Sequence, residues 1–85
     1  MILHVESVTV CGPYLLRLRF DDADERVVDV RPLLRGPVFE PLLDADFFAR
    51  AELDPVCRTV VWPNGADLAP EALRSLPNVE RLATA

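Results

Sequence analysis

Hydrophobic and polar residues alternate along the first third of the chain, as in β-strands that bury one face. The alternation runs over Ile2–Val10 and is cleanest over Tyr14–Phe20, and a valine-rich run follows over Arg26–Val30. We expect Cys11-Gly12-Pro13 and Asp21–Glu25 to form the intervening turns, because glycine, proline and aspartate favour turns. The pattern therefore predicts a three-stranded antiparallel meander.

Beyond this meander the hydrophobic residues recur every three to five positions, which favours short helical segments. Pro32 suits the first position of a single helical turn, and Pro70 suits the start of a last helix that runs through Leu76. Asp44 is expected to cap a turn of helix over residues 46–51. We expect these short helical segments to pack on the sheet.

Strand character returns briefly at Glu52–Asp54 and more strongly at Cys57–Trp62, which ends at the turn signal Pro63-Asn64-Gly65. We expect Val60 and Trp62 to share the buried face of that strand. The sequence thus predicts an α+β fold. It consists of a small, mostly antiparallel sheet, with the N-terminal meander and later strands, and short helices packed on one face.

Length and charge narrow the class of protein. Eighty-five residues with 51% hydrophobic residues predict one globular domain over residues 1–85, and we expect 78–85 to be a frayed tail. Nine basic against 14 acidic residues give a net charge of -5, which argues against binding to nucleic acid or an anionic membrane. No apolar run reaches the roughly 18 residues of a membrane span, and we expect a cytoplasmic protein.

The residues that usually carry catalysis or metal binding are sparse. Cys11, Cys57 and His4 are too few and too widely spaced for a structural zinc site. We expect Cys57 to pack as a small apolar side chain and Cys11 to lie in a turn. No nucleophile motif or nucleotide-binding loop is present. The sequence therefore predicts a noncatalytic protein that needs no cofactor and no metal.

Two charged clusters have simpler interpretations than a binding site. Arg17 and Arg19, with Arg58, form a basic stripe in which no aromatic residue alternates to stack on RNA bases, so we expect salt bridges with nearby acids. The Asp21–Glu25 run lacks the central glycine and terminal glutamate of a calcium loop. We expect that run to be a solvated turn.

A longer motif carries a family resemblance. Trp62-Pro63-Asn64-Gly65-Ala66-Asp67-Leu68-Ala69-Pro70-Glu71 resembles the closing signature of the bacterial domain of unknown function 2442, and Val28–Leu34 resembles its Val-Asp-Leu-x-Pro-Leu-Leu element. The resemblance extends from Val5 to Leu73. One departure lies in the turn after the second strand, where the family usually has Asp-Gly and this chain has Asp22-Ala23.

The resemblance implies a small α+β module, found alone or joined to a helix-turn-helix domain, and often encoded beside another small protein. It thereby implies a noncatalytic protein-binding or regulatory module, antitoxin-like in its pairing with another small protein. The alternative is a small-ligand-binding or enzymatic domain that uses the Trp62–Glu71 region. Self-association into a homo-oligomer stays open at this point.

The motif supplies the candidate interaction surface, and two interpretations of it remain open. It is either a platform for recognition or a structural corner, with Trp62 in the core, Gly65 in a conformation that other residues resist and Asp67 capping the following helix. The candidate residues are Trp62, Asn64, Gly65, Asp67 and Glu71.

Overall fold

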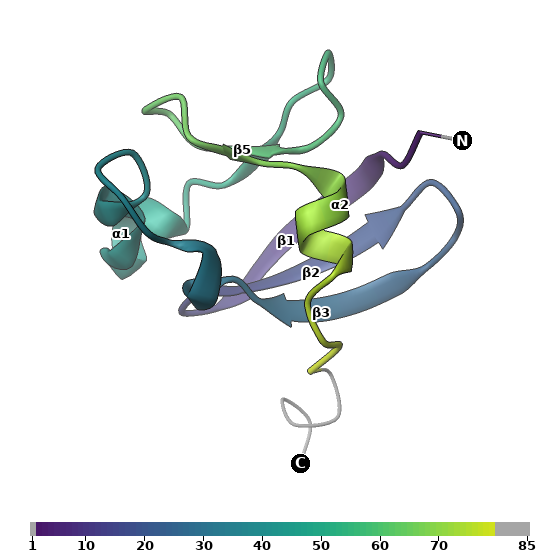
Figure 1. Cartoon of the computed structure of the whole chain (residues 1–85), viewed down its shortest axis with the longest axis horizontal. Coiled ribbons are helices and arrows are strands. Elements are labelled where there is room, and N and C mark those ends of the chain that lie inside the picture. The colour runs from purple at the N-terminus through teal and green to yellow at the C-terminus, as the bar shows by residue number, and fades with distance from the viewer. Residues whose placement is uncertain (1, 80–85) are drawn as a thin grey trace.

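The computed structural model describes residues 2–79 and consists of two three-stranded antiparallel sheets and several short helices. Figure 1 shows α1, α2 and the second sheet on one side of the first sheet. The first sheet has the order β1-β2-β3 and the second has the order β4-β5-β6. In chain order the elements are β1 (Val5–Gly12), β2 (Leu15–Phe20), β3 (Glu25–Asp29), the 3-10 helices η1 (Arg31–Leu33) and η2 (Glu40–Leu43), α1 (Ala45–Phe48), β4 (Glu52–Leu53), β5 (Val60–Val61), β6 (Asp67–Leu68) and α2 (Pro70–Arg74). The predicted α+β fold is confirmed.

The residues of β2 alternate between a buried and an exposed face, as the sequence predicted. Leu16, Leu18 and Phe20 are buried, whereas Arg17 and Arg19 on the opposite face are exposed. The buried face of the first sheet packs against Leu42, Phe48, Val60, Trp62 and Leu73 from the other layer. Burial of each large side chain in this core contributes about 1.5–3 kcal/mol to the free energy of unfolding.

The first turn differs from the prediction. Cys11 and Gly12 belong to β1, and the chain reverses at Pro13 and Tyr14 instead. Tyr14 has a left-handed φ of 64°, and its hydroxyl donates to the Leu43 carbonyl oxygen at 2.5 Å. Leu43 lies far from Tyr14 in the sequence, so the turn propensities of residues 11–14 could not predict this hydrogen bond or the position of the turn.

The predicted strand over Cys57–Trp62 is also shorter in the structure. Only Val60–Val61 form β5, because the Asp54 side chain accepts a hydrogen bond from the Val56 N–H and the Asp54 carbonyl accepts one from the Arg58 N–H. These bonds curl the chain into a turn that leaves Cys57 exposed. The expectation that Cys57 packs in the core, and that Cys11 lies in a turn, is therefore wrong.

Near the C-terminal end the sequence missed a strand. Asp67–Leu68 form β6 and pair with β5, in the register Val60 with Leu68 and Val61 with Asp67. The helix α2 begins at Pro70 as predicted but has Ala69 at its N-cap and no side-chain cap. The expectation that Asp67 caps this helix is wrong, because the ladder with β5 holds Asp67 in β6, two residues before the N-cap Ala69.

The sequence predicted the cap of helix α1 but not the contacts at the end of the described chain. Asp44 caps α1 as predicted, since its side chain accepts a hydrogen bond from the Asp46 N–H. The expected frayed tail begins at Asn78, but Asn78 and Val79 both hydrogen-bond to Val27, and residues 80–85 lie outside the described part. Within residues 2–79, no helix is long and apolar enough to cross a membrane.

Candidate interaction surface

Trp62, the first residue of the motif, lies inside the molecule. Its side chain is 3% exposed, and its ring centroid lies 5.7 Å from that of Phe48. The indole Nε1–H donates to the Phe48 carbonyl oxygen at 3.0 Å, so the polar end of the ring is also satisfied internally. Trp62 therefore joins β5 to α1 and offers no ring face for recognition.

The turn that follows Trp62 is exposed but internally bonded. Gly65 has a φ of 88°, which glycine adopts without strain, and its N–H donates to the Trp62 carbonyl. The Asn64 side chain donates to the Val38 carbonyl at 3.0 Å and accepts from the Ala66 N–H at 3.1 Å. Both ends of this amide thus stabilise a corner between two loops.

The remaining candidates lie on different elements. Asp67 is exposed on β6, and Glu71 is exposed in the first turn of α2. The Asp54 carboxylate, with a smaller contribution from the Asp67 charge, raises the pKa of the Cys57 thiol. Asp67 thus acts on the Cys57 turn, whereas Asn64 bonds to Val38, so the polar groups of the motif face different neighbours.

The two edges of the first sheet form a second kind of candidate surface. In an antiparallel strand the N–H and C=O groups of successive residues point alternately to the two neighbouring strands. At the β3 edge the outward N–H of Val27 donates to the Asn78 Oδ1 at 3.1 Å, and its carbonyl accepts from the Val79 N–H at 2.8 Å. The chain therefore covers this edge with its own C-terminal segment.

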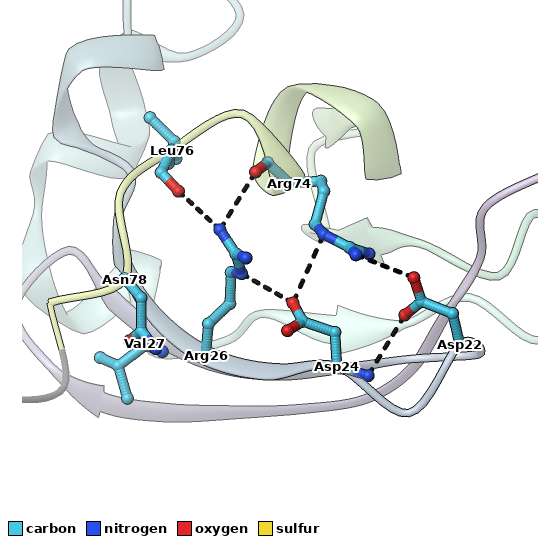
Figure 2. Close-up of polar contacts among 7 residues, drawn as sticks. All are labelled: Asp22, Asp24, Arg26, Val27, Arg74, Leu76 and Asn78. Carbon is cyan, nitrogen blue, oxygen red and sulfur yellow. Dashed lines mark hydrogen bonds and ion pairs between the residues drawn. The ribbon is translucent and has the colours of Figure 1, made fainter.

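A network of charged side chains holds that segment in place (Figure 2). The Arg26 guanidinium donates to the Arg74 and Leu76 carbonyls at 3.2 and 3.0 Å and to Asp24 at 2.8 Å. Arg74 forms an ion pair with Asp22 at 2.8 Å, and this contact lowers the pKa of the Asp22 carboxyl. The acidic turn, predicted to be merely solvated, thus anchors the end of α2.

In the described part of the chain, the edge of the first sheet at β1, unlike the edge at β3, is not covered by the C-terminal segment. The Phe20 N–H donates to the Asp24 carbonyl on the β3 side, so alternation along β2 directs the groups of Arg19 and Arg17 toward β1. Their register partners are Ser7 and Thr9. The backbone groups of the intervening Val8, and of Val10 after Thr9, consequently point away from β2.

Nothing in the described chain pairs with these outward groups. Within residues 2–79, the outer side of β1 takes part in one backbone hydrogen bond, from the Val5 N–H to the Arg58 carbonyl at 2.9 Å. Residues 6–12 form backbone hydrogen bonds to β2 alone in that part of the structure. β4 packs against β1 without a backbone hydrogen bond to it in the described residues. We call the outer side of residues 6–12, whose outward backbone groups no segment of residues 2–79 pairs, the open edge.

Comparison with known proteins finds a family of unknown function and a solved structure that resemble this chain. A family model described as "Protein of unknown function (DUF2442)" matches residues 5–76, and no curated protein matches the chain. The crystal structure of NE0471 from Nitrosomonas europaea ATCC 19718, described as a putative DNA binding protein, has a TM-score of 0.76 and 24% sequence identity. The match covers 98% of this chain and 53% of NE0471, so the chain spans about half the length of that protein. At this identity the likeness shows the fold.

Proposed function

Since the chain belongs to the DUF2442 family of proteins of unknown function, we propose that it is a noncatalytic protein-binding module that accepts an extended segment of a partner chain on its open edge. The observation that carries this proposal is the outward direction of the Val8 and Val10 backbone groups, which no segment within residues 2–79 pairs. Such groups form a template for an added strand.

The composition of the open edge supports strand addition. Ser7–Val10 pairs with β2 in regular register between two irregularities at the ends of β1, so this stretch is straight enough to extend the sheet. It contains neither the lysine nor the proline that commonly blocks edge strands. The nearest charge, Glu6, lies 3.5 Å from the Arg19 guanidinium and is partly neutralised.

The alternative function, a ligand-binding or enzymatic domain at Trp62–Glu71, has weaker support. The Trp62 Nε1 and the Asn64 amide are engaged by the backbones of Phe48, Val38 and Ala66. A small-molecule site needs polar groups that converge on one cavity. Because the motif directs its polar groups to the protein itself, we favour the binding of a protein at the open edge.

DNA binding is not part of the proposal. NE0471 is described as a putative DNA binding protein, but this chain covers 53% of it and carries a net charge of -5. Phosphate contacts by basic side chains supply most of the affinity for DNA, and an acidic domain opposes them. A regulatory or antitoxin-like pairing with another small protein fits the open edge better.

The proposal is tested with two variants at one position. Val8→Pro removes an outward N–H while leaving the bonds between β1 and β2, whereas Val8→Thr keeps the N–H and nearly the same shape. Tagged wild type and both variants are used to isolate complexes from the native host. We expect wild type and Val8→Thr to hold the same partner and Val8→Pro to lose it.

Hydrogen exchange on the wild-type complex provides a second measurement that does not depend on how the proline variant folds. The amide hydrogens of Val8 and Val10 are expected to exchange rapidly in the isolated monomer and slowly in any complex that adds a strand to the open edge. Retention of the partner by a folded Val8→Pro variant, or equal exchange rates of these amides in the monomer and in the complex, would contradict strand addition.

A further inference from the structure

We propose, resting on the function proposed above, that the strand accepted by the open edge is β1 of a second copy of this chain. The two β1 strands run antiparallel about a two-fold axis at Thr9. Val8 of each copy then lies opposite Val10 of the other, and the two first sheets join into one continuous sheet.

The register follows from which backbone groups are already used. The Val5 N–H bonds to the Arg58 carbonyl on the outer side of β1, so the open edge begins after Val5. It ends at Gly12, where β1 ends. Thr9 is the centre of this stretch, and pairing centred there places the outward backbone groups of Val8 opposite those of Val10 in the second copy.

The two-fold axis also respects the faces of the sheet. Residues directly opposite each other in an antiparallel pair lie on the same face. With Thr9 opposite Thr9, the exposed faces of the two sheets lie on the same side of the joined sheet. With Val8 opposite Val10, the half-buried faces also lie on one side. A shift by one residue would place a polar face against an apolar one.

The side chains of the open edge are complementary to themselves. Threonine pairs and valine pairs both stabilise antiparallel sheets when directly opposite. The single charge within residues 6–12, Glu6, falls opposite Gly12 of the second copy rather than opposite another acid. The register therefore brings no like charges together, which matters for a chain with a net charge of -5.

The rest of the sheet explains why the assembly closes at two copies. At the far edge the outward groups of Val27 are covered by Asn78 and Val79 of the same chain. A sheet with one open and one covered edge pairs once through a two-fold axis and leaves no template for further growth.

Cross-linking tests the register directly. Thr9 bonds to β2, so Thr9 and its counterpart form a non-hydrogen-bonded pair with Cα atoms about 4.5 Å apart, which a disulfide can span. The background is Cys11→Ser with Cys57→Ser, since both cysteines are exposed. We expect Thr9→Cys to oxidise to a covalent dimer and the control Glu25→Cys, on the same face of β3, to form no covalent dimer.

Sedimentation equilibrium of the native chain tests the pairing itself. We expect a mass of twice 9.5 kDa for wild type and Val8→Thr. For Val8→Pro we expect a rise of about tenfold or more in the dimer dissociation constant, because two symmetric hydrogen bonds are lost. A monomeric wild type, or equal cross-linking of Thr9→Cys and Glu25→Cys, would overturn the pairing.

The outcomes separate this inference from the proposed function. If the wild type is monomeric, and the Val8→Pro variant loses a different protein partner that the wild type binds, self-pairing is refuted and strand addition is retained. A folded Val8→Pro variant that keeps every partner, the second copy included, refutes both.

Discussion

Ala23, in the turn between β2 and β3, stands where the family usually has glycine, and its replacement by glycine is expected to stabilise the protein. Ala23 has a left-handed φ of 72°, its N–H donates to the Phe20 carbonyl at 3.0 Å, and its methyl group is exposed. A residue with a Cβ pays about 1–2 kcal/mol in this conformation. Glycine avoids that strain without losing a packed contact.

The gain is reduced by the greater freedom of glycine in the unfolded chain, which costs about 0.4–1 kcal/mol. The difference predicts that Ala23→Gly raises the free energy of unfolding by about 0.5–1 kcal/mol. For a domain of this size that corresponds to a rise of roughly 2–8 °C in Tm.

Urea denaturation and thermal melting of wild type and Ala23→Gly measure this difference. The matched control is Ala49→Gly, because Ala49 is also exposed but has a right-handed φ of -65° at the end of α1. The control is expected to lose about 0.4–1 kcal/mol. A loss of stability in Ala23→Gly as well would refute the reasoning, since the turn would then gain nothing from relief of strain.

Three further predictions concern the core, the caps and the acidic turn. Trp62→Ala is expected to lower the free energy of unfolding by about 3–5 kcal/mol in urea denaturation, as an aromatic cavity does; a loss under 1 kcal/mol would show that Trp62 is not an anchor. Asp67→Ala is expected to change it by less than about 0.5 kcal/mol and Asp44→Ala to lower it by about 1 kcal/mol, because only Asp44 caps a helix. Arg74 lowers the pKa of Asp22, so their ion pair stabilises the fold above the ordinary carboxyl pKa of about 4 and is lost as pH falls through the lowered pKa. Asp22→Asn should therefore melt below wild type at pH 7 and together with it in strong acid; a gap that persists in acid would contradict this assignment.

The sequence alone determined those features of this protein that depend on residues close together in the chain. The burial of Leu16 and Phe20 follows from alternation along β2. The cap at Asp44 and the start of α2 at Pro70 follow from the local chemistry of helix ends. The tryptophan motif likewise indicated both the family and a structural corner, because its turn residues and its large apolar anchor are adjacent in sequence.

Tertiary structure decided the features that depend on residues far apart. Tyr14 takes a left-handed turn with its hydroxyl on the Leu43 carbonyl, and Val27 is covered by Asn78 and Val79 from the other end of the chain. No local pattern distinguishes a covered sheet edge from an open one, because the residues of a strand do not reveal which distant segment pairs with its outward backbone groups. The open edge at β1 emerges only when the whole chain is folded and the backbone partners of each strand are known.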